Sequence, residues 1–428
     1  MSQHSREKVR VGLVGAGFVA RIHAEAYRRV YGVAVELRGV AAAHRERAAA
    51  FAEEFGVARV YDDAEALLAD GEIDLVDVCV PPYLHAPIAI AAARAGKHII
   101  VEKPLTGYFG PAPRPPNNGG FPEPPIIGGP GGISGSGGSS VGALDRATML
   151  RGALANADAM LEAVRGAGVK LCYAENWCYA PPIRKADRLL AASKAAVLRI
   201  VGEESHSGTH SEPNKRWVTA GGGSLIGKAC HPLGGALFLK YREGLRRDGK
   251  PVRPVAVSAE VASFTRMASF AATEPKWLRT GYEDVEDWGT MLVTFDDGSV
   301  AQITGADTVL GGIRNQLTVF ASNTLVQCNI NPNDACLAYT PDPRAFDGEY
   351  ITEKIETTAG WTHPSPDEDF ITGYPAELQD FCEAIACDRE PDSGPLLARD
   401  TIAIIYGAYL SAERGQRIDL RPYLAPTP

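Results

Sequence analysis

The chain has 428 residues, a formal net charge of -9, 45% hydrophobic residues and 22% charged residues. This length favours two domains, and the composition is that of an ordinary globular protein. The acidic balance argues against nucleic acid as a main partner, because phosphate binding needs a basic face. No apolar stretch approaches the length of a membrane span, so we expect no membrane partner.

The first residues and the cysteines bear on the compartment. Residues 1–8 are polar and lack the apolar core of a signal peptide, so we expect a cytoplasmic location. The eight cysteines are scattered, and none forms a Cys-x-x-Cys pair. We therefore expect reduced, buried thiols and no metal site.

The first hundred residues alternate between strand and helix patterns. Asp62 or Asp63 can cap a short helix that ends at Leu68. The remaining elements are predicted as strands at 9–14, 35–42, 73–80 and 98–101, and helices at 18–30, 45–55 and 85–95. The β-branched run at 73–80 is typical of a strand buried on both faces. The alternation predicts an α/β fold with a doubly wound parallel sheet of the Rossmann type.

Residues 107–140 interrupt this pattern, since 19 of these 34 positions are Gly or Pro. Such a segment cannot hold a helix or a central strand. It is either a disordered surface insertion or a long ordered loop that covers the active site or contacts a neighbouring subunit. Its apolar residues could anchor it; these are Tyr108, Phe109, Phe121, Ile126 and Ile127.

The rest of the chain shows a different pattern of predicted elements. Asp145 can cap a helix that runs to Val164, and residues 171–176 form a last strand of the first sheet. Further strands are predicted at 197–207, 252–264, 290–295, 300–303 and 316–330, with a tight hairpin at Asp296-Asp297-Gly298. They predict an open, mostly antiparallel sheet. Helices at 374–386 and 397–413 would return to the first domain. We divide the chain into a dinucleotide-binding domain, 1–180, and an α/β substrate-binding and oligomerisation domain, 181–428.

The motif Gly15-x-Gly17-x-x-Ala20 follows the first strand and opens a helix. The first glycine permits a tight turn, the second lets the backbone approach a pyrophosphate, and Ala20 allows close contact between helix and strand. In this context the motif predicts a dinucleotide site that includes Phe18 and Val19.

The end of the second strand determines the ribose preference. An NAD enzyme usually has an acidic residue there, but this chain has Ala41-Ala42-Ala43 followed by His44 and Arg45. The basic side chains favour the 2′-phosphate of NADP over NAD. Alternatively, His44 and Arg45 are only a solvated helix start.

Further candidates follow the later strands, where open α/β sheets bind their ligands. Pro81 ends one strand, and His85 either contacts the cofactor or only begins the next helix. Glu102-Lys103-Pro104 ends another. A positive nicotinamide beside Lys103 should lower its pKa, so that it could assist proton transfer to or from a substrate hydroxyl. The alternative is that Lys103 is only an exposed lysine that follows a strand.

The second domain contributes Gly221-Gly222-Gly223, followed by Lys228 and His231. If one helix holds both residues, they lie three apart on one face. A histidine titrates in the range useful for accepting a hydroxyl proton, although His231 could also be structural. Asn176 and Tyr179 are candidates for binding substrate hydroxyls.

Taken together, these residues resemble the Gfo/Idh/MocA oxidoreductase family. The resemblance rests on the Gly15 loop, Glu102-Lys103-Pro104, the glycine triplet leading to His231, residues 285–298, and Glu377-Leu378-Gln379-Asp380-Phe381. It implies NAD(P), hydride transfer to or from a hydroxyl carbon of a sugar or polyol, and oligomers formed through the open sheet, either dimers or tetramers. It also implies that Lys103 is the catalytic lysine and His231 the catalytic or substrate-binding histidine.

Two departures from the family pattern matter. An aspartate often stands four residues before the histidine, but here that residue is Gly227, with Lys228 beside it. The proton relay therefore differs from the usual Asp/His pair, and Lys228 either replaces part of it or binds an anionic substrate group. The insertion at 107–140 is much longer than the turn usually found there, which could change substrate access.

The sequence therefore favours an NAD(P)-dependent dehydrogenase of a sugar, glycoside or cyclic polyol. Lys103 and His231 would be the acid/base groups, and Asn176, Tyr179 and Lys228 would position the substrate. One alternative is a redox-assisted lyase or glycosidase that oxidises its sugar transiently with a tightly bound, recycled cofactor. Another is a cofactor-binding sensor without catalysis.

Overall fold

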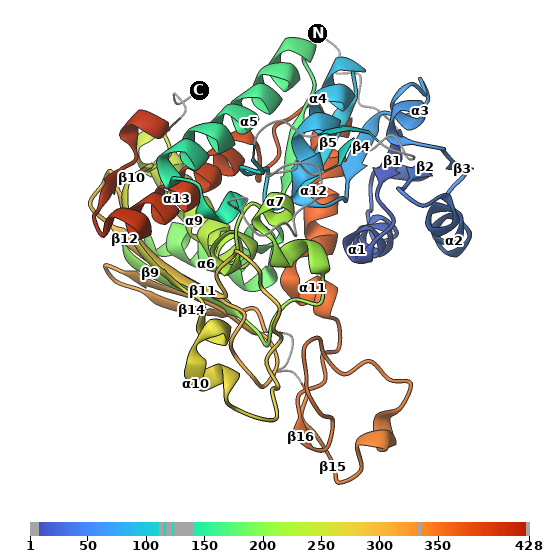
Figure 1. Cartoon of the computed structure of the whole chain (residues 1–428). Helices are drawn as coiled ribbons and strands as arrows, with labels where there is room; N and C mark the ends of the chain where they lie inside the picture. The colour runs from blue at the N-terminus through green and yellow to red at the C-terminus, as the bar shows by residue number, and fades with distance from the viewer. Residues whose placement is uncertain (1–7, 111–113, 117–121, 124–139, 332–335, 425–428) are drawn as a thin grey trace.

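A computed structural model describes residues 8–110, 114–116, 122–123, 140–331 and 336–424, and arranges them around two β-sheets (Figure 1). In this part of the chain, every helix is too short or too polar to cross a bilayer.

The first sheet has six strands in the order β3-β2-β1-β4-β5-β8, and all of its pairings are parallel. Its strands are β1 Lys8–Val14, β2 Ala34–Ala41, β3 Arg59–Val60, β4 Leu75–Val78, β5 His98–Glu102 and β8 Leu171–Ala174. Its helices are α1 Phe18–Tyr27, α2 Arg45–Phe55, α3 Ala64–Leu68, α4 His85–Arg94 and α5 Arg146–Ala167. This confirms the predicted doubly wound sheet.

Local signals account for several boundaries. Asp63 accepts a hydrogen bond from Ala66 N and so caps α3, and Asp145 caps α5 in the same way. Gly56 and Gly168 end α2 and α5 in the left-handed conformation. Helix α1 is shorter than predicted and ends at Tyr27.

The Gly/Pro-rich segment is described only in part. A short hairpin pairs β6 Arg114–Pro116 with β7 Pro122–Glu123. At its start, Tyr108 N donates to Tyr406 Oη over 2.6 Å, and Trp217 Nε1 donates to Tyr108 O over 3.1 Å. The segment is therefore fixed to the second domain where it leaves β5. The proposed anchors Phe121, Ile126 and Ile127 lie outside the described residues.

The second sheet has seven strands in the order β14-β13-β9-β12-β11-β10-β17. They are β9 Val197–Ser205, β10 Pro254–Ala262, β11 Trp288–Phe295, β12 Val300–Ala306, β13 Arg314–Ala321, β14 Leu325–Asn329 and β17 Ile418–Asp419. The β9–β12 pair is parallel, whereas the other pairs are antiparallel. The predicted hairpin at Asp296–Gly298 joins β11 to β12. The single strand expected at 316–330 is instead a hairpin, because Ser322-Asn323-Thr324 turns the chain.

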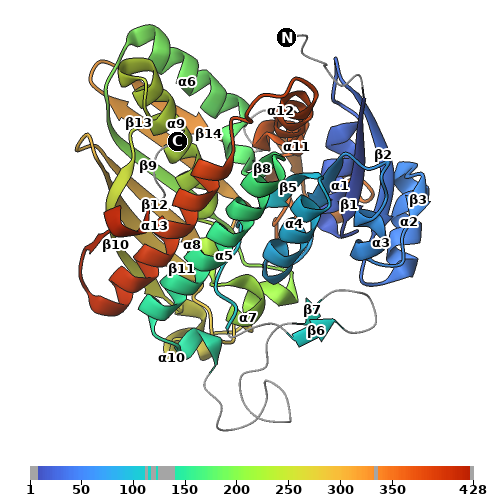
Figure 2. The ribbon, with the colours of Figure 1, turned by 90° about the horizontal axis from the view of Figure 1, so that it is seen from above.

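Helices join the two sheets and cover one face of the second (Figure 2). Helix α9, Cys230–Asp248, lies against β9, and α6, Pro181–Ser193, packs on α9. Helix α12, Tyr374–Ala386, contacts α1, while α13, Pro395–Arg414, contacts α5 and β10. The shorter elements are α7 Trp217–Ala220, α8 Ser224–Gly227, α10 Ala268–Ala271, α11 Glu368–Thr372, β15 Ala338–Thr340 and β16 Gly360–Thr362.

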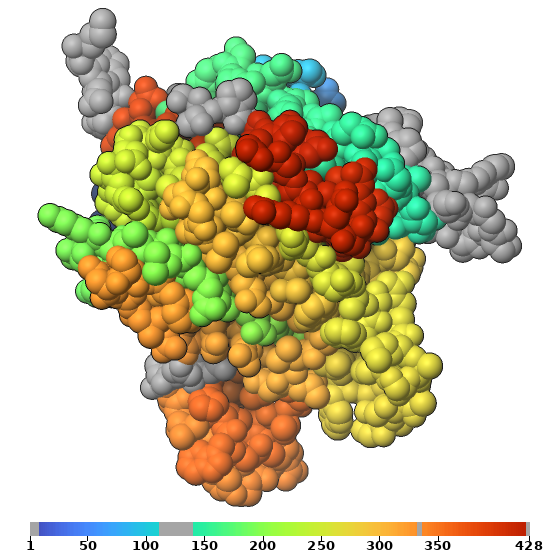
Figure 3. All heavy atoms as spheres, turned by 90° about the vertical axis from the view of Figure 1, so that its left-hand side faces the viewer, coloured from blue at the N-terminus to red at the C-terminus, as the bar shows by residue number. Residues whose placement is uncertain are grey.

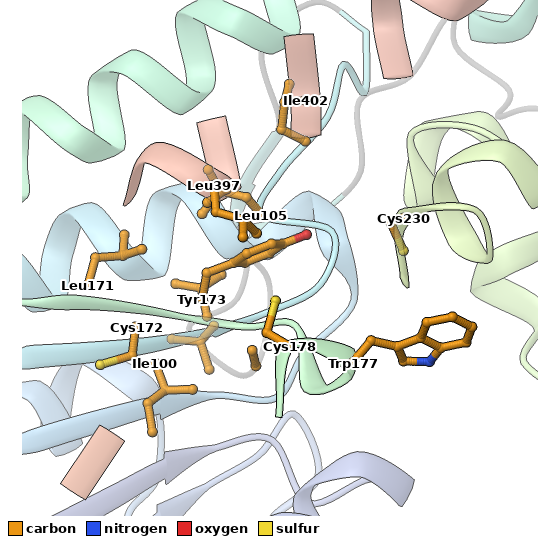
Figure 4. Close-up of a cluster of buried hydrophobic side chains, with 14 of the residues drawn as sticks. Ile100, Leu105, Leu171, Cys172, Tyr173, Trp177, Cys178, Cys230, Leu397 and Ile402 are labelled. Atoms are coloured by element: carbon orange, nitrogen blue, oxygen red, sulfur yellow. The ribbon is translucent and has the colours of Figure 1, made fainter. Parts of the chain in front are cut away.

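Two further features complete the arrangement. Around β15 and β16 the chain projects as a lobe beyond the second sheet (orange in Figure 3). A buried apolar cluster joins the two halves, in which Leu105 and Tyr173 of the first lie beside Leu397 and Ile402 of α13 (Figure 4).

Candidate active site

The loop between β1 and α1 has the geometry of a phosphate cradle. Gly15 has a φ of +114°, and a Cβ there would lie 2.0 Å from the carbonyl oxygen of Cys79, so only glycine fits. Gly17 precedes α1, and a Cβ there would meet nothing within 4 Å. Ala20 is fully buried, whereas Phe18 is exposed. The open space before the amino end of α1 fits a pyrophosphate, which the helix dipole would favour.

The end of β2 presents two exposed basic side chains to solvent. His44 precedes α2 and lies 3.8 Å from Glu46, and Arg45 forms an ion pair with Asp62. No acidic side chain stands at residues 41–45. The expected ribose-binding position therefore carries basic residues, and one of them, Arg45, is already paired with Asp62.

Lys103 follows β5 and reaches across to the second domain. Its Nζ donates to the carbonyl oxygen of Gly227 over 3.2 Å. Burial, the largest influence, lowers the pKa of Lys103, but the combined attraction of neighbouring anionic groups, which include Glu204, raises it above its usual value. The lowered pKa expected from the sequence refers to a lysine beside a bound, positive nicotinamide, and that expectation stays a prediction. The lysine is held as an ammonium group at the junction of the two domains.

A buried polar network is connected with Lys103 through Glu102, the residue that precedes it. The amide of Lys103 donates to Glu102 Oε2 over 3.1 Å, and Glu102 Oε1 lies 3.1 Å from His23 Nε2. His23 Nδ1 lies 2.9 Å from Asp77 Oδ2, which also accepts from Tyr27 Oη. Burial disfavours the imidazolium, but the charge of Asp77 helps to raise the pKa of His23 well above its usual value. Glu102 is thus positioned by a charged network.

His85 has a positioning role that the sequence left open. It is buried at the start of α4, with Nδ1 2.9 Å from Pro104 O and Nε2 2.8 Å from Val80 O. Burial lowers the pKa of His85, so the neutral ring donates to one of these carbonyls at a time. The ring therefore links the turn after β4, which contains Pro81, to the turn that carries Lys103.

The glycine triplet is required by a close approach to Glu286. Gly221 and Gly222 have φ of +79° and +153°. A Cβ on Gly223 would lie 1.9 Å from the carbonyl oxygen of Glu286. The buried carboxylate of Glu286 accepts hydrogen bonds from the amides of Gly223 and Leu225. These contacts fix the loop that leads to His231.

Lys228 and His231 are not held by one helix, which was the condition under which they would lie on one face. Helix α8 ends at Gly227, Lys228 is its C-cap, and α9 begins at Cys230. The break lies where β12 packs tightly, since a Cβ on Gly305 would come within 2.6 Å of Ala229 N. Lys228 Nζ is 3.9 Å from Asp307 Oδ1. Asp307 is also 3.4 Å from His206 Nδ1, so a buried cluster of mixed charge lies beside His231.

His231 is buried between two carboxylates. Its Nδ1 lies 2.7 Å from Glu175 Oε1, and its Nε2 lies 3.8 Å from Glu204 Oε2. The Trp177 ring stacks on the imidazole with centroids 6.2 Å apart. Burial, followed by repulsion from Lys103 and Lys228, lowers the pKa of His231 well below its usual value. The site therefore keeps a neutral imidazole, the form that can accept a proton.

Glu204 has an unusual environment for a carboxylate. Burial raises the pKa of Glu204 to about 7, although Lys103 and Lys228 act in the opposite direction. Its Oε2 has no hydrogen-bond partner among the described residues. A carboxyl group of this kind changes charge near neutral pH.

Glu175, Cys230 and His231 also place potential ligand atoms within 4.8 Å of one another. Burial raises the pKa of the Cys230 thiol, whereas a metal ligand must be a thiolate. We assign no metal to this cluster.

Asn176 and Tyr179 are directed elsewhere. Asn176 Nδ2 donates to Thr372 O over 2.9 Å, and Tyr179 Oη donates to Asp380 Oδ2 over 2.7 Å. Both are buried, and Tyr179 also accepts from Ser393 N. Their polar atoms attach the turn after β8 to the helices at 368–386, so the structure does not support the substrate contacts predicted from the sequence.

Several site residues escaped the sequence analysis. Glu175 follows β8, Glu204 stands near the end of β9, and Asp307 follows β12. All three are acidic residues near strand ends, a signal that could have been used. What the sequence could not supply was the register that turns Glu204 toward His231 and Glu203 away from it.

These features describe a chain built on two sheets, the first in a dinucleotide-binding fold, with half-buried Lys103 and buried His231 at the junction between them. Residues 9–110 match the model of GFO_IDH_MocA, the oxidoreductase family with an NAD-binding Rossmann fold. The match covers the dinucleotide-binding domain and agrees, for this domain, with the resemblance found in the sequence.

Curated relatives are similar to the same region. Levoglucosan dehydrogenase of Pseudarthrobacter phenanthrenivorans is 43% identical over 105 residues, which cover 23% of this chain and 27% of that protein. Myo-inositol 2-dehydrogenase of Thermotoga maritima is 33% identical over 98 residues, 23% of this chain and 29% of that protein. The matches thus span less than a third of either relative.

A solved structure matches over nearly the whole length. GenD2 from gentamicin A biosynthesis, in complex with NAD, superposes with a TM-score of 0.73 at 24% identity and covers 98% of both chains. At this identity the likeness establishes a shared fold.

Proposed function

We propose that the protein is an NAD(P)-dependent dehydrogenase that acts on a hydroxyl carbon of a sugar, glycoside or cyclic polyol. The observation that carries this proposal is the meeting of Lys103, from the dinucleotide-binding domain, with the Gly227–His231 loop of the second domain. The names of the curated relatives, which include sugar and inositol dehydrogenases, support the substrate class.

The buried acid/base groups suit alcohol oxidation. A bound nicotinamide supplies hydride acceptance or donation. Lys103, held as an ammonium, polarises the substrate oxygen, and neutral His231 Nε2 accepts the hydroxyl proton. Glu175 at Nδ1 holds the ring in the orientation that directs Nε2 toward the site. The same groups act in reverse for carbonyl reduction.

We assign substrate positioning to Lys228 and not to Asn176 or Tyr179. Lys228 is buried beside Asp307 and belongs to the loop that carries His231. Its ammonium can donate to ring hydroxyls of the substrate or pair with an anionic group. We retain the division into residues 1–180 and 181–428 as part of this proposal.

The cofactor preference is proposed on one observation. The residues at the end of β2 include no carboxylate for ribose hydroxyls, whereas His44 and Arg45 are exposed there. This favours NADP over NAD. Because Asp62 pairs with Arg45, the preference should be modest.

The second sheet also suggests an oligomer. Leucines on β9, β11 and β14 are exposed: Leu198 by 55%, Leu292 by 45% and Leu325 by 59%. Apolar side chains gathered on a sheet favour burial against a partner. We propose a homo-oligomer formed through this face, a dimer or a tetramer.

The test is a screen of reduced-nicotinamide absorbance with levoglucosan, myo-inositol, D-glucose, D-xylose and methyl glycosides. NAD and NADP are supplied separately. Steady growth with one pair establishes the dehydrogenase. Lys103→Met should abolish that growth, whereas Lys185→Met, at an exposed position on α6, should not.

Two other results would replace the proposal. Consumption of a glycoside without net reduction, with cofactor retained on the purified protein, would establish a transient-redox lyase or glycosidase. Cofactor binding without consumption of any compound in the panel would favour a sensor.

A further inference from the structure

The central strand of the second sheet brings a carboxylate to the catalytic histidine. β9 pairs with β12 and β13, so Glu204 lies opposite Gly305 and Asn315 in the middle of the sheet. Gly202, on the same face, lets Pro232 of α9 approach closely, since a Cβ there would lie 2.8 Å from Pro232 Cβ. This contact brings His231 against the strand. Glu204 Oε2 then lies 3.8 Å from His231 Nε2, in ion-pair range but beyond a direct hydrogen bond.

The charged and titratable groups around Glu204 come from several neighbouring elements. They are Lys103 after β5, Glu175 after β8, Lys228 after α8, Cys230 and His231 at the start of α9, Asp307 after β12, Glu353 before β16, and Tyr374 of α12. Two lysines thus oppose several carboxylates in a buried space. The Glu204 side chain is only 11% exposed, so its charge is poorly screened by solvent.

We propose that Glu204 is the positioning carboxylate that stabilises protonated His231, in place of the aspartate that the family pattern has at position 227. The proposal rests on the proposed dehydrogenase function. In this chain position 227 is a glycine, which contributes only its carbonyl oxygen to Lys103. Glu204 acts through His231 and not on the substrate, because its Oε2 is buried.

The proposed step moves one proton to His231 and one hydride to the cofactor. When the substrate alcohol is oxidised, its O–H bond breaks and an N–H bond forms at His231 Nε2. The C–H electron pair leaves as hydride to the nicotinamide cofactor. The resulting imidazolium lies between the carboxyl groups of Glu175 and Glu204. Ionised Glu204 lowers the energy of that cation through its charge.

The kinetic test compares neighbouring substitutions on one strand. Glu204→Gln removes the charge, whereas Glu203→Gln changes the next residue, which faces away and pairs with Arg314. The assay uses the sugar and cofactor that give the fastest turnover in the screen above. We expect Glu204→Gln to lower kcat roughly tenfold or more and to move the acid limb of the pH profile to lower pH. Glu203→Gln should change neither.

A rescue variant separates this role from mere structural damage. A Cβ on Gly227 would meet nothing within 4 Å, so a side chain can leave the backbone there without an immediate clash. Gly227→Asp in the Glu204→Gln background should recover a large part of the lost kcat. No recovery together with an unchanged pH profile would overturn the proposal.

A measurement without substrate keeps the proposal testable if the screen finds no turnover. The ring resonances of His231, assigned by comparison with His231→Asn, are followed by NMR from acid to alkaline pH. In the unmodified chain they should sense a titration close to pH 7, which Glu204→Gln removes and Glu203→Gln retains. A titration that persists in Glu204→Gln would refute the link. The absence of turnover alone would refute only the dehydrogenase assignment.

Discussion

The glycine at position 223 should be intolerant of even one added methyl group. In Gly223→Ala the new Cβ would lie 1.9 Å from the carbonyl oxygen of Glu286, where real contacts are longer than 3.0 Å. The loop must therefore move by about 1 Å. That movement disturbs the hydrogen bonds from Gly223 N and Leu225 N to the Glu286 carboxylate and from Ser224 N to its carbonyl.

The cost of this movement can be worked out from the bonds involved. Each of the three lost hydrogen bonds contributes about 1 kcal/mol, and a poorly satisfied buried carboxylate adds about 1–3 kcal/mol, which gives about 4–6 kcal/mol. At about 2 °C per kcal/mol for a large chain, the midpoint of thermal unfolding should fall by about 8–12 °C.

The measurement is thermal unfolding by circular dichroism, with Gly227→Ala as the matched control. Position 227 lies four residues further along the same loop, and a Cβ there meets nothing within 4 Å. This helical glycine should accept alanine with a gain of up to about 1 kcal/mol. Equal midpoints for the two variants would show that the close approach to Glu286 does not require glycine.

Three further outcomes are expected. Lys103→Met should lower turnover by about 10²–10⁴-fold while tryptophan-quenching titrations with NADH change little, and preserved turnover would remove the lysine from the chemistry. Arg45→Ala should raise KM for NADP relative to that for NAD; an unchanged ratio would refute the basic ribose site. Burial raises the pKa of Glu204 to about 7, so the folded chain holds that proton more tightly than the unfolded chain and loses stability as pH rises from about 4.5 to 7. At about pH 8 the free energy of unfolding of Glu204→Gln should therefore exceed that of the unmodified chain by up to about 3 kcal/mol, which raises its unfolding temperature. At about pH 4.5 it should show no such gain. A difference independent of pH would contradict this reasoning.

The first sheet was readable from sequence because each of its signals is local. The strand before Gly15, the caps at Asp63 and Asp145, and the stop at Gly56 depend on residues that are neighbours in the chain. The antiparallel character of the second sheet was also predictable. Its one parallel pair, β9 with β12, was not, because pairing between distant strands leaves no local trace.

The site was only partly readable for a related reason. Lys103 and His231 stand in motifs, so their meeting could be anticipated from the family resemblance. The partners of Asn176 and Tyr179 come from helices about 200 residues later, and these satisfy side chains that looked free for substrate. Glu204 has no motif, and its position depends on sheet register.

The ring of His23 connects the phosphate cradle with the turn that carries Lys103. His23 stands on α1, the helix whose amino end faces the phosphate cradle, and its Nε2 contacts Glu102, which in turn holds the amide of Lys103. A displacement of α1 along its axis would be transmitted through one rigid ring to the residue beside the lysine. The phosphate cradle and the turn that carries the lysine are thus linked through one buried side chain.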